Sequence, residues 1–143
     1  MRVMSFLLSA SLLALCGAVA VAANSTTVVM NGQEQWKPQP GNYEMATLYG
    51  DPSKSGFYVI RLKVPANWSF PAHYHPGREN ATVISGTFYV GFGTKLDKSK
   101  VTAYTAGSFA SIPPKLPHYA LTKSDGAVVQ VEGEGPFGET IIK

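Results

Sequence analysis

The chain predicts an all-β fold, a sandwich or a barrel, and three observations lead to this prediction. After residue 24, glycine and proline interrupt every stretch before a helical period of 3.6 residues can develop. Short runs rich in β-branched and aromatic residues recur instead, each bounded by turn residues. Their number and spacing are typical of sandwiches and barrels. The expected strands are residues 26–30, 43–48, 57–64, 82–84, 87–92, 101–104, 108–112, 119–122 and 127–131.

The run 57–64 shows the strand pattern most clearly. Its even-numbered residues are apolar, whereas its odd-numbered residues include Arg61 and Lys63. Because successive side chains of a strand point to opposite faces, the even-numbered residues are expected to face the core. Ser85-Gly86 is predicted to be a tight hairpin turn between two strands. Residues 33–42 are predicted to form an irregular segment that packs on the outside of the barrel.

The first 22 residues have the pattern of a secretory signal peptide. Arg2 provides a positive start, residues 6–21 form an apolar run without a charge, and small residues follow in an Ala-x-Ala pattern. The run is shorter than the roughly 20 residues that span a bilayer, which argues against an uncleaved anchor. We therefore predict cleavage after Ala22, with Ala20 and Ala23 as alternatives, and one domain over residues 23–143. The mature protein is expected to be periplasmic or secreted, without stable membrane insertion.

Cys16 is the one cysteine of the chain. Lipid attachment at Cys16 is an alternative fate for this region, but the preceding residue, Leu15, is not small, as such processing requires. A mature chain without cysteine has no disulfide, so its stability must come from its core, a metal or a partner subunit. A cysteine nucleophile and a thiolate metal ligand are excluded as well.

The charge distribution gives no support to a nucleic-acid partner. Without Arg2, 11 of the 12 basic residues remain against 9 acidic ones, which gives the expected mature chain a formal charge of +2. Apart from a group at Lys95, Lys98 and Lys100, which we expect in a solvated loop, the basic residues are scattered.

A candidate metal site lies in residues 71–86. His73 and His75 are one residue apart, so an extended strand projects both imidazoles to the same side. Pro76-Gly77 then turns the chain, and Glu79 can return toward that side. Two imidazoles and a carboxylate that converge on one point are ligands of a divalent transition metal.

His118 is the third and last histidine of the chain, and it follows a proline-rich turn at the start of another expected strand. All three histidines therefore fall in two strand-edge segments, which makes His118 a candidate fourth ligand. The alternative is a hydrogen-bonded histidine cluster without a metal; closely spaced imidazoles beside a carboxylate favour the metal.

These segments resemble the two motifs of the cupin superfamily. His73-x-His75-x3-Glu79-x6-Gly86 matches the spacing of the first motif, and Gly107-x5-Pro113-x-Lys115-x2-His118 is similar to the second. The chain looks like the small single-domain, RmlC-like cupins, including the cupin domains of anti-sigma factors and germin-like metal sites. It departs from the second motif at Lys115, where a glycine is usual, and at Thr122, where an asparagine is expected. The first departure suggests a differently shaped turn.

The resemblance implies a jelly-roll-like β-barrel with a 3-His-1-carboxylate site made by His73, His75, Glu79 and His118. It implies one divalent metal, and the ligand types do not choose among Fe, Mn, Zn, Ni and Cu. Two functions are compatible with such a site. One is a metal-dependent enzyme of the dioxygenase or oxidase type that acts on a small molecule; the other is a non-catalytic metal- or ligand-binding or sensing module.

No substrate-binding residue is distinguished by the sequence. Arg78 is a candidate partner for an anionic substrate, although a surface pairing is expected more often. Gln130 and Glu132 share one face of a strand, which either looks into the barrel or faces solvent. Of Phe88, Tyr89 and Phe109, some are expected to line the cavity. Exposed sheet edges favour pairing with a second copy, so we predict a homodimer.

Overall fold

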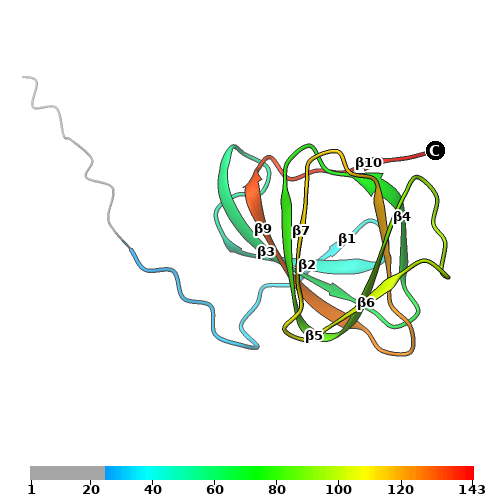
Figure 1. The fold of residues 1–143 in the computed structure, drawn as a ribbon. Helices are drawn as coiled ribbons and strands as arrows, with labels where there is room; N and C mark the ends of the chain where they lie inside the picture. Colours follow the sequence, from blue (N-terminus) through cyan, green and yellow to red (C-terminus); the bar gives the residue numbers. More distant parts are fainter. Residues whose placement is uncertain (1–24) are drawn as a thin grey trace, which may run out of the picture.

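Ten strands build residues 25–143, the part of the chain that this computed structural model describes (Figure 1). The signal peptide expected at residues 1–22 lies outside these described residues and stays a prediction. No helix in the described part of the chain is long and apolar enough to cross a membrane. The strands are β1 (Lys37–Gln39), β2 (Tyr43–Tyr49), β3 (Gly56–Val64), β4 (Ser69–Tyr74), β5 (Glu79–Phe92), β6 (Thr102–Thr105), β7 (Phe109–Ile112), β8 (His118–Leu121), β9 (Ala127–Gly135) and β10 (Thr140–Ile141).

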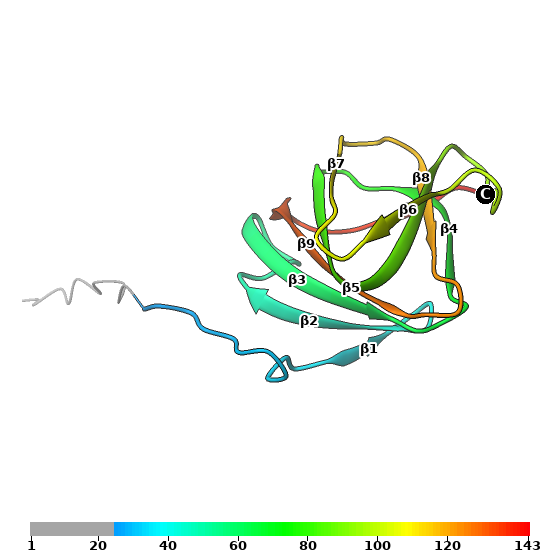
Figure 2. The same cartoon turned by 60° about the horizontal axis from the view of Figure 1, so that its bottom comes forward.

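The strands form one antiparallel sheet that curls into a barrel. Its order is β1-β2-β3-β9-β5-β8-β4-β10, and β6 and β7 pair with the two halves of β5. The first half of β5 pairs with β9 and β7, and its second half pairs with β8 and β6. In Figure 2, β5 passes from the side of β3 and β9 to the side of β8 and β4. The all-β, jelly-roll-like prediction is therefore confirmed.

The predicted hairpin turn at Ser85-Gly86 is wrong, because β5 continues through it as one strand of 14 residues. The register shifts between Val83 and Ser85, which bends the strand. Gly86 has a φ of 74°, and a Cβ added there would lie 2.0 Å from the carbonyl oxygen of Gly126. The glycine thus serves a close approach between β5 and β9 rather than a turn between two strands.

The core lies inside the curl of the sheet. As predicted, the even-numbered residues of β3 face it, and Tyr58, Ile60 and Val64 are at most 2% exposed. Leu62 packs against the same core. Each fully buried side chain of this size contributes about 1.5–3 kcal/mol. The buried cluster comprises Tyr58, Ile60, Val64, Trp68, Val83, Ala120, Ala127, Val129 and Val131.

The expected strand at residues 26–30 is absent from the structure, where this segment is irregular and leads away from the barrel (Figure 2). Val28 and Met30 are 67% and 61% exposed, so the apolar residues that suggested a strand have no neighbour to pair with. The chain meets the barrel through an ion pair between Glu34 and Arg61 on the outer face of β3. Residues 33–42 do pack outside, as predicted, but they include the short strand β1.

The C-terminal segment runs back to β4. After β9, the amide of Phe137 donates to the carbonyl of Pro52 over 2.7 Å, and β10 then pairs with β4, with Ile141 opposite His73. The amide of Ile142 donates to the carbonyl of Ala72 over 2.8 Å. Residues 136–142 therefore lie beside the strand that carries the first two histidines.

Candidate metal centre

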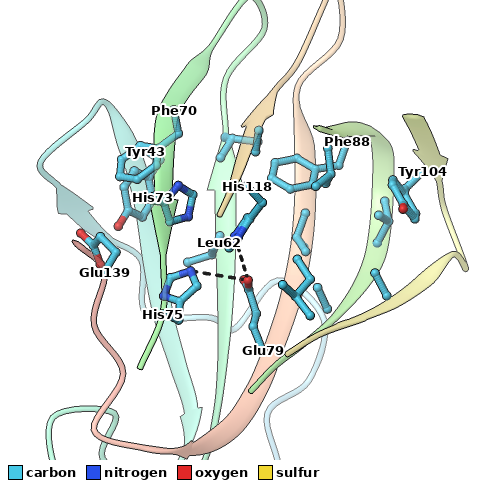
Figure 3. Close-up of a pocket in the computed structure, with 18 of the residues that line it drawn as sticks. Tyr43, Leu62, Phe70, His73, His75, Glu79, Phe88, Tyr104, His118 and Glu139 are labelled. Atoms are coloured by element: carbon cyan, nitrogen blue, oxygen red, sulfur yellow. Dashed lines mark ion pairs between the residues drawn. The ribbon is translucent and has the colours of Figure 1, made fainter. Parts of the chain in front are cut away.

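Three neighbouring strand ends bring the predicted ligands together (Figure 3). His73 lies near the end of β4 and His75 directly follows that strand. His118 opens β8 and is paired with His73 across the β4–β8 ladder. Glu79 is the first residue of β5. Figure 3 shows His75, His118 and Glu79 pointing toward one another, with His73 beside His118.

The separations suit a common metal ion. The ligand nitrogens of His73, His75 and His118 all lie within 4.8 Å of one another. Glu79 contacts two of the three, with its Oε2 atom 3.5 Å from His75 Nε2 and 3.3 Å from His118 Nε2. Neighbouring donors of a tetrahedral or octahedral ion with bonds of about 2.1 Å lie roughly 3.0–3.4 Å apart. The three imidazoles therefore form a cluster that could hold one ion, and Glu79 lies beside two of them.

The backbone fixes which nitrogen of each imidazole faces the centre. The Nδ1 atoms of His73, His75 and His118 lie 2.8, 2.7 and 2.9 Å from the carbonyl oxygens of Pro71, Gly138 and Leu116. A carbonyl only accepts, so in the neutral rings Nδ1 carries the proton. The Nε2 lone pairs are then free for a metal, the arrangement in which histidine ligands are usually held.

The buried Oε2 atom of Glu79 has no hydrogen-bond partner. Its neighbours are Nε2 atoms, which carry lone pairs when Nδ1 is protonated, so the contact is repulsive unless a positive charge lies between. Unpaired buried carboxylate oxygens are costly. A cation among these four groups, or a proton on an imidazole, would remove the repulsion.

The electrostatics of the cluster follow from burial and mutual contact. Burial, together with the charges of the other two histidines, lowers the pKa of His73 to about 4, although the hydrogen bond to the Pro71 carbonyl opposes this shift. Burial opposes ionisation of Glu79, but the three histidines outweigh it and hold the pKa of this carboxyl below its usual value. Burial also lowers the pKa of His118, yet contact with Glu79 raises it overall. Without a metal, His118 therefore binds a proton more readily than His73 does.

The ligands form one wall of a cavity of about 70 Å³ inside the barrel. Among the other lining residues, four come from β5 and two each from β3 and β7, and most of the set are apolar or aromatic. They are Tyr43, Leu62, Val64, Trp68, Phe70, Ala81, Val83, Phe88, Val90, Tyr104, Ser108, Ala110, Ile112, Ala120, Val129, Phe137 and Glu139.

The polar substrate-binding candidates from the sequence lie elsewhere. Arg78 is exposed and donates to Ser111 Oγ over 3.1 Å on the outer surface. Gln130 accepts from Arg61 Nε on the outer face, and Glu132 occupies the same face of β9. Their strand therefore turns its polar face away from the cavity, as one of the two alternatives proposed.

Of the three aromatic candidates, Phe88 lines the cavity. The other two do not line it. The Lys123 ammonium lies 4.4 Å from the centroid of the Tyr89 ring, and Phe109 is 58% exposed. Strand alternation explains the difference, because Phe88 and Tyr89 are adjacent on β5 and must face opposite sides.

The two departures from the second motif have clear structural outcomes. Lys115 adopts a φ of 62°, the region that favours glycine, so the expectation of a differently shaped turn is not supported. Its amide donates to the carbonyl of His75 over 2.9 Å. Thr122 supports the core instead of the ligands: its Oγ1 atom donates to the carbonyl of Pro65 and accepts from the amide of Trp68.

Sequence reasoning missed the contribution of residues 137–139. The carbonyl of Gly138 accepts from His75 Nδ1, and Glu139 lines the cavity beside Tyr43 (Figure 3). Burial and the charge of Glu139 together raise the pKa of Tyr43. The sequence of this segment shows no periodic pattern. Pro136 and Gly138 interrupt it, and the strand that follows, β10, has only two residues.

The sequence pattern of the family described as "Cupin domain" matches residues 60–132, about half of the chain. Germin-like protein 5-1 of Oryza sativa subsp. japonica is 36% identical over 67 residues. That match covers 45% of this chain and 29% of the relative, so the chain spans less than a third of that protein's length.

Solved structures share the fold at low identity. The polyketide cyclase RemF from Streptomyces resistomycificus superposes with a TM-score of 0.70 at 17% identity, over 83% of this chain and 87% of that one. An RmlC-like cupin from Shewanella frigidimarina NCIMB 400 superposes with a TM-score of 0.61 at 16% identity, over 77% of this chain and 91% of that one. A chain from the complex of SigE with the anti-sigma ChrR of Rhodobacter sphaeroides superposes with a TM-score of 0.56 at 18% identity, over 73% of this chain and 51% of that one.

Proposed function

The chain belongs to the cupin domain family, and from this premise we propose that it is an exported protein that binds one divalent transition metal, Fe, Mn, Zn, Ni or Cu. The proposed ligands are His73, His75, Glu79 and His118. One observation carries the proposal: the buried Oε2 atom of Glu79 has no hydrogen-bond partner and faces the Nε2 atoms of two histidines. A cation satisfies this arrangement, because it accepts lone pairs from all of these atoms.

The chain's own residues support such a site in two ways. Backbone carbonyls orient the three imidazoles, so little rotamer freedom would be lost on binding. Glu79 supplies one negative charge that would offset part of the charge of a divalent ion in a largely apolar surrounding. A metal held by four protein groups can supply Lewis-acid or redox chemistry at positions that remain open.

We propose that the site serves a metal-dependent reaction of the dioxygenase or oxidase type on a small molecule. The support is a cavity that adjoins the ligands and is lined by apolar side chains, which favours binding of a small molecule away from bulk water. Among the lining residues outside the ligand set, Glu139 and the hydroxyls of Tyr43, Tyr104 and Ser108 are the groups that can move a proton.

The second candidate is a non-catalytic binding or sensing module. It is favoured by the scarcity of ionisable groups inside the cavity. Beyond the ligands the lining is mainly apolar, and Glu139, the one other carboxylate among residues 25–143 that lines it, is exposed. In that case the metal holds a ligand without turnover.

Elemental analysis of the purified mature protein tests the metal site. We expect about one metal per chain, loss of the metal in His118→Ala, and much weaker retention in Glu79→Gln. Glu132→Gln is the matched control, because it removes a carboxylate from the outer face of β9. A wild-type chain that stays metal-free after expression in metal-replete medium would rule the site out.

Oxygen uptake separates the two functions. The metal-loaded wild type is compared with a His73→Ala, His118→Ala double variant across small phenolic and dicarboxylate compounds. Turnover in the wild type alone supports the enzyme. Metal-dependent binding without a difference in oxygen uptake supports the module, and zinc as the native metal would exclude the dioxygenase version.

We further propose that the mature protein is a homodimer in the periplasm or outside the cell. Apolar side chains on the outer surface support pairing: Phe57, Ile84 and Phe109 are 49%, 41% and 58% exposed. The edge strands β1 and β10 are also available for contacts. Sedimentation analysis of the mature protein tests this, and a monomer at micromolar concentration contradicts it.

A further inference from the structure

The charges around the cavity argue against an anionic ligand. Among its lining residues in the described part of the chain there is no lysine or arginine, whereas Glu79 and Glu139 are both acidic. The basic residue that neighbours a ligand in sequence, Arg78, is exposed and pairs with Ser111 outside. A carboxylate ligand would therefore meet two like charges, and the metal alone would offset its desolvation.

An aromatic wall leads away from the histidines. The ring of Phe70 meets His73 edge-on, with centroids 4.9 Å apart and 87° between the planes. Trp68 stacks beside Phe70 at 5.7 Å and 17°, and Phe88 continues the row at 6.3 Å and 26° from Trp68. Three rings in nearly parallel succession thus start at a proposed metal ligand and extend along the cavity.

The wall is held in place from behind. The indole nitrogen of Trp68 donates to the carbonyl of Gly41 over 2.6 Å, and its amide donates to Thr122 Oγ1 over 3.0 Å. Its polar N–H is therefore satisfied away from a ligand, and its ring is what remains to contact one. Phe70 and Phe88 are only half-buried although both lie inside the barrel, so part of each ring faces the cavity. Rigid aromatic faces favour flat, apolar ligands.

We propose that this cavity binds a neutral aromatic molecule that carries an oxygen donor, of the phenol type, with its ring along the Phe70–Trp68–Phe88 wall and its oxygen toward the histidines. The inference rests on the proposed metal function and names the class of its ligand. The hydroxyls of Tyr43 and Tyr104 supply polar contacts at the cavity wall, where a further ring substituent would lie.

Binding to the zinc-loaded mature protein tests the inference, because zinc has no redox chemistry and binding is measured without turnover. The probes are 4-methylphenol, benzoate and succinate, titrated by calorimetry and by quenching of tryptophan fluorescence. We expect 4-methylphenol to bind at least tenfold more tightly than succinate and severalfold more tightly than benzoate. Equal or tighter binding of succinate, or no binding of 4-methylphenol, would overturn the inference.

Variants locate the bound ring. Phe88→Leu and Phe70→Leu each keep an apolar side chain but lose the aromatic face, and each is expected to weaken 4-methylphenol binding about fivefold. The Phe70→Leu variant is compared at matched zinc content, because the ring of Phe70 contacts His73. Phe109→Leu is the matched control, because Phe109 is exposed on the outer surface. Unchanged affinity in both cavity variants contradicts the aromatic wall. Zinc content measured on the same samples identifies failure of the metal site itself: a chain without zinc removes the proposed function and this inference together.

Discussion

The ring of Phe137 stacks on the imidazole of His75, with centroids 5.0 Å apart and 19° between the planes. The carbonyl that accepts from His75 Nδ1 belongs to Gly138, the next residue along the chain. Two consecutive residues of the C-terminal segment therefore fix both the tilt and the tautomer of a proposed ligand. The same segment is pinned at Pro52 and at Ala72 by backbone hydrogen bonds.

Phe137→Ala is predicted to lower metal affinity about tenfold, because His75 would lose the ring that holds its orientation. Loss of this kind of support typically costs 10–100-fold in affinity. Competition with a chelator of known affinity measures the effect. Phe57→Ala is the control, since Phe57 is exposed on the outer face, where it packs on Tyr49. Equal affinities of the two variants would show that the stacking has no role in binding.

The metal-free protein is predicted to lose stability as the pH falls from 6.5 to 4. The pKa of His73 is lowered by burial to about 4 in the folded state, whereas the unfolded chain protonates near 6.5. The part of the free energy of unfolding that depends on neutral His73 is therefore fully present above pH 6.5. It declines as the pH falls below 6.5 and is lost once the pH is below the folded pKa. At 1.36 kcal/mol per pKa unit, the loss is at most about 3 kcal/mol.

Urea denaturation of the metal-free protein at a series of pH values measures this effect. His73→Asn removes the titrating group and should give a shallower decline between pH 6.5 and 4. His118 acts in the opposite direction, because its raised pKa adds stability at low pH that is lost as the pH rises. A variant whose decline matches the wild type would show that His73 does not titrate as described.

Gly86→Ala is predicted to destabilise the fold by about 3 kcal/mol, because it combines a left-handed backbone with a Cβ 2.0 Å from a carbonyl oxygen. Gly107→Ala is the matched control: its φ is 86°, but nothing lies within 4 Å of an added Cβ. That variant should cost only about 1 kcal/mol. Thermal or denaturant unfolding compares the two, and equal costs would mean that the contact between β5 and β9 relaxes freely.

Expression of the full chain in a bacterium with an intact export pathway should yield a protein that begins at Ala23. The apolar run and the Ala-x-Ala pattern predict cleavage after Ala22. Intact-mass measurement of the periplasmic and membrane fractions tests this. A membrane-bound form that starts at Cys16 and carries extra lipid mass would support lipidation instead.

The sequence predicted the β class and the ligand cluster because both depend on short spacings. One residue separates His73 from His75 along the chain, and alternation along a strand puts them on one side whatever the rest of the fold does. The buried face of β3 was predictable for the same reason. His118 was a candidate because it opens an expected strand after a proline-rich turn, and the pairing of β4 with β8 accounts for its position opposite His73.

What the sequence could not show depends on contacts between distant segments. Gly86 signals a turn in local statistics, yet its role is set by the approach of Gly126, 40 positions later. The apolar residues at 28–30 suggest a strand, but a strand needs a neighbour and this segment has none. Phe137 and Gly138 carry no periodic signal, and only the return of the chain past Pro52 brings them to His75.

The position of Glu79 at the start of β5 has a consequence for the whole barrel. This end of β5 pairs with β7 and β9, whereas the three histidines belong to the paired segments around β4 and β8. An ion held by all four would connect the two sides of the barrel, which has no cysteine for a disulfide within residues 25–143. Free metal at 100 times its dissociation constant would then add about 2.7 kcal/mol to folding. The melting temperature of the protein would thus report the metal supply of the compartment in which it resides.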